Sequence, residues 1–147
     1  MEKFWKSSHW LTRLILLPPT AIFTLIGGRF LAHPVASAAL QGIVLPPGIG
    51  VTIARVAMGG FPLGCAIFVA TCLLSTRRLL TGLTFVSILL SVLLVVRVVG
   101  MNADSTVQEN MKLVKAELGL LAVTGVGFFV ELSRLSYLRR ARVTDFN

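Results

Sequence analysis

Four long apolar runs constrain this chain more than any other feature of its sequence. They extend approximately over residues 10–31, 50–74, 79–101 and 114–138. Each is close to the ~20 residues that a helix needs to cross the hydrocarbon core of a bilayer. A helix also satisfies its own backbone hydrogen bonds, as a segment shielded from water must. The sequence therefore predicts an all-α fold, a transmembrane four-helix bundle.

The composition agrees with a membrane location and predicts one domain. Charged residues make up only 14% of the chain, whereas roughly 25% is usual in soluble domains. No polar block is long enough to form a second domain, so we expect residues 1–147 to form a single integral membrane domain. The net charge of +8 does not indicate nucleic-acid binding, because the basic residues flank the apolar runs instead of forming a stripe with interleaved aromatic residues. The expected partner is the lipid bilayer.

The basic residues also predict the orientation of the spans. They cluster before or at the start of the first run, between the second and third, and after the fourth: Lys3, Lys6, Arg13, Arg77, Arg78, Arg139, Arg140 and Arg142. Lysine and arginine accumulate on cytoplasmic connections, so both termini are expected in the cytoplasm. We expect the first run to be retained as an anchor, because it contains Pro18-Pro19 and the best small-residue cleavage pattern lies far downstream at 36–38.

The connection between the first two spans, residues 33–49, is unusually apolar. Leu40, Ile43, Val44 and Leu45 precede Pro46-Pro47-Gly48. This pattern is typical of a short interfacial helix or re-entrant piece that the prolines and glycine end. The alternative is a loop packed over the mouth of the bundle.

Small residues at four-residue or eight-residue spacing predict where the helices pack closely. The candidates are Gly60 and Gly64, with Gly59 beside them, then Ser87 with Ser91, and Gly119 with Gly127. Helices in lipid associate by close backbone approach, which small residues permit. We interpret these patterns as packing within the chain, with dimerisation as the alternative. Pro62, between the glycines, predicts a distortion of the second span.

Five charged residues are expected at one depth near the outer leaflet. They are Arg29, Arg55, Arg97, Asp104 and Glu117, each at or near the end of a span. A charge inside the bilayer normally pairs or reaches the interface, so one interpretation is structural: Glu117 accepts from Arg55 or Arg97, and the arginines snorkel. The alternative is a ligand-binding pocket with excess positive charge, suited to an anionic lipid or small amphiphile.

The remaining polar residues predict no metal site, cofactor or catalytic motif. Glu131 and Arg134 are three residues apart, which allows an intrahelical ion pair. His9 and His33 flank the first span at opposite ends, and neither has a cysteine or carboxylate at ligand spacing. Cys65 and Cys72 are seven residues apart in one predicted helix, too far for a disulfide.

The order of these residues resembles a family of short bacterial four-span membrane proteins catalogued as a domain of unknown function. The matching positions are Gly27-Gly28, Arg55 with Gly59-Gly60, Arg97, Asp104 and Glu117, within residues 20–130; Ser105 stands where the family pattern has glycine. The resemblance implies the four-span fold and a bacterial inner membrane. In architecture alone, the chain is also similar to DoxX-type four-helix membrane proteins and to the small scaffold protein of the sterol-synthesis complex.

Three functional hypotheses follow. The first is a non-catalytic accessory or scaffold subunit of a larger membrane complex, with other membrane protein subunits as partners. The second is a binder or carrier of an anionic lipid or small amphiphile through Arg29, Arg55 and Arg97. The third is a membrane enzyme with Asp104 or Glu117 as acid or base, which lacks a nucleophile, metal or oxyanion donor in the sequence.

Overall fold

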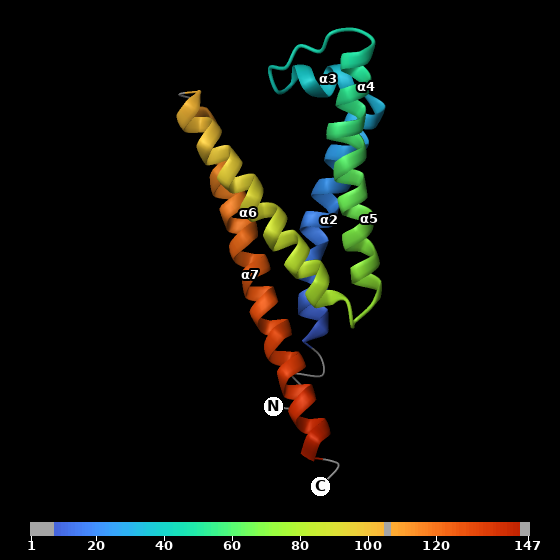
Figure 1. The fold of residues 1–147 in the computed structure, drawn as a ribbon, viewed down its shortest axis with the longest axis vertical. Coiled ribbons are helices and arrows are strands. Elements are labelled where there is room, and N and C mark those ends of the chain that lie inside the picture. Colours follow the sequence, from blue (N-terminus) through green and yellow to red (C-terminus); the bar gives the residue numbers. More distant parts are fainter. Residues whose placement is uncertain (1–7, 105–106, 145–147) are drawn as a thin grey trace. The chain divides into compact units, whose positions relative to one another are not determined.

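The computed structural model describes residues 8–104 and 107–144, and their regular structure is entirely helical (Figure 1). Four helices are long and apolar enough to cross a membrane: His9–Ala32, Ile49–Leu74, Leu79–Ala103 and Asn110–Leu138. The predicted all-α, four-span fold class is confirmed. The chain forms two compact units, which we describe separately. The first-hairpin unit is Leu17–Thr71, and the second-hairpin unit comprises the described parts of Met1–Leu16 and Cys72–Asn147.

In the first-hairpin unit, a short helix follows the first span, as predicted, but it begins earlier in the connection than expected. Helix α2 (His9–Ala32) is followed by α3 (Pro34–Ala39), which starts with proline at its first turn. Proline suits that position because its fixed φ is helical and its missing N–H is not needed there. Residues 40–42 form a turn in which Gly42 has φ of 73°, and residues 43–46 are irregular. The helix therefore precedes the apolar residues that were expected to form it.

The second span consists of three consecutive helical segments. They are α4 (Ile49–Ala54), the π-helical segment η1 (Arg55–Gly60) and α5 (Phe61–Leu74). At the end of η1 the N–H of Phe61 donates to the carbonyl of Val56, five residues back. Pro62 has no N–H for the preceding turn, and its ring would clash with a carbonyl in regular α-helical register. The wider π turn relieves that clash, so the distortion expected at Pro62 lies in the turn before it.

The close helix contact in this unit joins Gly27 of α2 to Gly59 of η1. A Cβ atom on Gly27 would lie 2.8 Å from the Gly59 carbonyl oxygen and 2.7 Å from Cγ of Leu63. Gly60 and Gly64 do not form this contact: among the described residues, no atom of another helix lies within 4 Å of a Cβ at either position. Of the three glycines predicted to pack in this span, Gly59 therefore lies at the contact, with Leu63 just after the π turn, and Gly60 and Gly64 do not.

In the second-hairpin unit, helices α6 (Leu79–Ala103) and α7 (Val107–Thr144) form an antiparallel hairpin (Figure 1). Helix α7 extends beyond the expected 114–138 at both ends. The start of α2 also packs here, because a Cβ on Gly127 would lie 3.1 Å from Cδ1 of Ile15 and 3.2 Å from Cδ2 of Leu83. The apolar core of α6 consists of residues on one face: Leu79, Leu83, Val86 and Leu90.

Only some of the predicted small residues lie at close contacts in this unit. Gly127 does. Gly82, which was not among the predicted residues, also lies at a close contact, because a Cβ there would lie 2.9 Å from Cβ of Cys72. Gly119 does not, since no described atom lies within 4 Å of a Cβ there. Ser91 is exposed and donates to the carbonyl of Ser87 in its own helix, while Ser87 has a buried hydroxyl. Four-residue spacing places residues on one face, but the neighbouring helix determines whether that face is packed.

Candidate functional site

Arg97 and Glu117 form a two-pronged ion pair between α6 and α7. Arg97 Nε donates to Glu117 Oε2 at 2.9 Å, and Nη2 donates to Oε1 at 2.7 Å. Nη1 donates to the Asn110 side-chain oxygen at 3.2 Å. The two side chains keep 29% and 18% of their surface exposed. Of the two arginines expected to pair with Glu117, the structure therefore gives this role to Arg97.

Asp104 lies beside this pair without joining it. It follows the last residue of α6, where its backbone N–H donates to Gly100, and its side chain is exposed. It lines a shallow cavity of about 310 Å³ whose walls belong to the second-hairpin unit: Leu93, Val96, Arg97, Gly100, Met101, Asp104 and Asn110. Asp104 is thus accessible, and among the described residues it is the one carboxylate that lines this cavity.

Arg29 and Arg55 belong to the first-hairpin unit, near the end of α2 and at the start of η1. Both are exposed, and their own unit contains no acidic residue with which they could pair. Of the five charged residues expected at one depth, the structure therefore brings Arg97 and Glu117 together. The wider cluster across both units stays a prediction.

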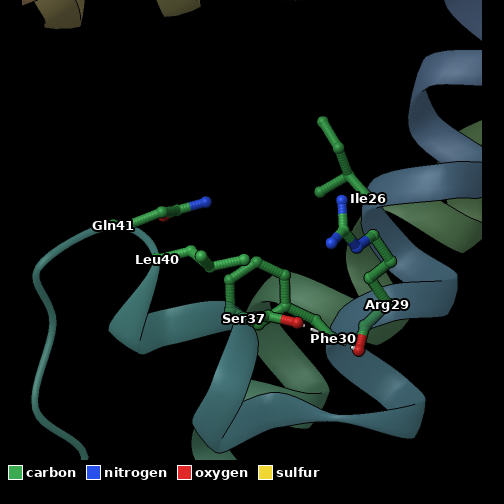
Figure 2. A pocket seen from close by; sticks show the side chains of 6 residues that line it. All are labelled: Ile26, Arg29, Phe30, Ser37, Leu40 and Gln41. Atoms are coloured by element: carbon green, nitrogen blue, oxygen red, sulfur yellow. Dashed lines mark hydrogen bonds between the residues drawn. The ribbon is translucent and has the colours of Figure 1, made fainter.

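A cavity of about 200 Å³ lies beside Arg29, between the end of α2 and the turn after α3 (Figure 2). Its wall is mostly apolar and is made by Ile26, Phe30 and Leu40 together with the polar residues Arg29, Ser37 and Gln41. The Ser37 hydroxyl donates to the backbone carbonyl of Arg29 at 3.2 Å, which holds α3 against α2. Figure 2 shows Arg29 and Gln41 on opposite sides of the hollow.

A buried polar network at the other end of the second-hairpin unit involves α2 and α7. Arg134 Nη1 donates to Glu131 Oε1, which confirms the predicted intrahelical pair. The second oxygen, Oε2, accepts from the Thr12 hydroxyl at 3.1 Å. Glu131 and Thr12 are fully buried, and Arg134 is 7% exposed. Sequence reasoning missed the link to Thr12, which is 119 positions away; a threonine inside an apolar run was its one visible signal.

Arg13 follows Thr12 in the sequence, but its side chain has contacts of its own. Its Nη2 donates to the Thr76 hydroxyl at 3.4 Å, and its guanidinium lies 5.1 Å from the ring centre of Trp10. Such a cation–π contact holds the charge near an aromatic ring that suits the membrane interface. The Nε atoms of Arg13 and of Arg134 are both buried without a described hydrogen-bond partner.

The arrangement assigns the two carboxylates of the fourth span to structural contacts. Glu117 joins α7 to α6, and Glu131 joins α7 to the start of α2. Comparisons with family models, curated proteins and solved structures find no match for this chain.

Proposed function

We propose that the chain is a non-catalytic accessory or scaffold subunit of a larger membrane assembly. The observation that carries this proposal is the use of both span carboxylates, Glu117 and Glu131, to tie helices together. Glu117 joins the two helices of the hairpin and Glu131 joins α7 to the start of α2, while α6 and α7 also carry large exposed apolar side chains such as Ile88, Val95 and Phe129. A set of helices joined by polar contacts, with apolar side chains exposed, suits contact with lipid and with the helices of other subunits.

The test is to recover the protein with its neighbours intact. A tagged full-length chain at native expression level is solubilised in mild detergent and separated by blue-native electrophoresis. We expect it to migrate with other polypeptides that mass spectrometry identifies reproducibly. An unrelated four-span protein carrying the same tag is the control for non-specific association. Migration of the chain alone in several mild detergents, and after cross-linking in the membrane, would contradict the proposal.

The enzyme hypothesis is separable from this one by substitution. The double variant Asp104→Asn, Glu117→Gln removes both candidate acid–base groups and keeps their size. As a non-catalytic subunit, the chain should still complement a deletion strain when expressed at equal level. Glu117→Gln alone should weaken the link to Arg97, so the protein level in the membrane must be measured beside growth. Loss of complementation at an unchanged protein level would favour catalysis.

We further propose a bacterial cytoplasmic membrane location with both termini in the cytoplasm, which agrees with the placement of lysine and arginine. Single cysteines at the exposed positions Gln41, Asn102 and Arg77 test it. A membrane-impermeant thiol reagent added to intact cells should label the first two and not the third. Cys65 and Cys72 are buried, so they give a low background. Labelling of Arg77→Cys from outside would contradict this topology.

A further inference from the structure

We infer that the cavity beside Arg29 binds the anionic phosphate head group of a membrane amphiphile. This site is independent of the proposed accessory role. It lies at the end of the first span, where head groups occur if α2 crosses the bilayer. The first-hairpin unit, residues 17–71, contains no acidic residue, so Arg29 has no carboxylate partner within its own unit.

The chemistry of the wall matches a phosphate. The Arg29 guanidinium presents several N–H donors in a planar fork, the geometry that binds phosphate through two parallel hydrogen bonds. Gln41 adds a carboxamide from the opposite side, with further N–H donors (Figure 2). None of the six described wall residues is acidic. The wall therefore offers donors and a positive charge.

The position of the wall is built into the fold. The buried Ser37 hydroxyl, bonded to the carbonyl of Arg29, fixes α3 at the end of α2. Gly42, at φ of 73°, turns the chain directly after Gln41, and this left-handed conformation favours glycine. An arginine that only snorkels to the interface needs no second wall. Here a short helix and a turn supply one.

The size and the apolar part of the cavity indicate an amphiphile. About 200 Å³ is several times the ~30 Å³ that a water molecule occupies in the liquid, which suits a head group and not a whole lipid. The acyl chains must then lie outside, against the helix surface. Ile22, Ile26 and Arg29 are spaced by four and three residues, so they share one face of α2. Both isoleucines are 42% exposed, which provides an apolar path leading away from the arginine.

Native mass spectrometry of the full-length chain in detergent tests this inference. The probes are phosphatidylglycerol, zwitterionic phosphatidylcholine and inorganic phosphate, each titrated separately. We expect one phosphatidylglycerol to bind most tightly, and Arg29→Gln to weaken it about tenfold, as loss of a charged hydrogen bond would. Arg77→Gln removes the same charge from an exposed loop outside the cavity and should leave the affinity unchanged.

A second variant keeps the test valid if Arg29→Gln folds poorly. Gln41→Glu is at an exposed position, and it places a negative charge opposite Arg29, so it should reduce phosphatidylglycerol binding as strongly. Gln108→Glu, also exposed, makes the same change outside the cavity and should have no effect. Equal affinity for both lipids, or unchanged binding in Gln41→Glu, would overturn the inference. Inorganic phosphate binding as tightly as the lipid would overturn an amphiphile as the occupant.

Discussion

The helices inside the first-hairpin unit and those inside the second-hairpin unit are held by different kinds of contact. In the first-hairpin unit, the backbones of α2 and η1 approach through Gly27 and Gly59, with no room for another carbon atom. In the second-hairpin unit, one arginine–glutamate pair joins α6 to α7. A second pair lies within α7, and its glutamate also bonds to α2. Lipid offers little hydrophobic force between helices, so close packing and polar links are the two available means. The first unit should therefore be sensitive to added volume, and the second to lost charge.

The largest effect should come from removing the buried carboxylate of the second unit. Glu131→Ala leaves Arg134 buried without its partner, which typically costs about 3–5 kcal/mol. We expect a markedly lower unfolding temperature in detergent, followed by far-UV circular dichroism. Replacing both partners, Glu131→Leu with Arg134→Met, should recover much of the loss because no charge is left unpaired. Wild-type stability in Glu131→Ala would show that the pair is not holding this unit.

The next largest effect should come from the glycine contact of the first unit. Gly27→Ala adds a Cβ within 3 Å of two backbone atoms, so the helices must separate at a cost of about 2–3 kcal/mol. The neighbouring Gly28→Ala is a matched control, because its Cβ meets no described atom within 4 Å. It should be neutral or slightly stabilising, since alanine favours helix. Equal unfolding temperatures for the two variants would remove the distinction drawn between the units.

The half-exposed pair should matter less than the buried one. Arg97→Gln removes the links to Glu117, and we expect a loss of about 1.5 kcal/mol in the free energy of unfolding. Arg97→Lys keeps the charge without the fork and should recover only part of this loss. Denaturant titration of the wild type, Arg97→Gln and Arg97→Lys measures the free energy of unfolding of each protein. Full recovery by lysine would mean that charge alone, and not two-pronged geometry, makes the contact.

The smallest effect concerns the hydrogen bond from α2 to α7. Thr12→Val keeps the shape but removes the donor to Glu131, at a cost of about 1 kcal/mol. Thr124→Val is the matched control: Thr124 is equally buried, but its hydroxyl donates only to carbonyls of its own helix. A double-mutant cycle with Glu131→Gln should show coupling for Thr12 and none for Thr124. Coupling of both would assign the effect to general repacking.

The sequence predicted the parts of the fold that depend on length and hydropathy. The four spans and the ion pair of Glu131 with Arg134 follow from local spacing, and the structure contains them. What spacing could not show is which face of a helix meets a neighbour. For that reason spacing could not distinguish Gly59, which lies at the contact, from Gly60 and Gly64, which do not. It also could not show that Ser91 is exposed.

The candidate site was predictable in its residue types and less so in its partners. Glu117 was expected to accept from one of two arginines, and only the structure distinguishes Arg97 from Arg55. The Arg29 cavity depends on where α3 starts. The helix starts at Pro34, and the apolar composition of this connection did not indicate that position. Thr12 was missed because its partner is distant in the sequence.

The length of α7 has a mechanical consequence. At 1.5 Å per residue, its 38 residues extend about 57 Å, more than the ~40–45 Å of a bilayer with its head groups. Unless the helix is steeply tilted, it projects into water as a stiff rod. The helix continues past the apolar span Asn110–Leu138, so its last turns then form a spacer outside the bilayer. Because a continuous helix is stiff, a change in the tilt of the span inside the lipid would also move this end of the helix.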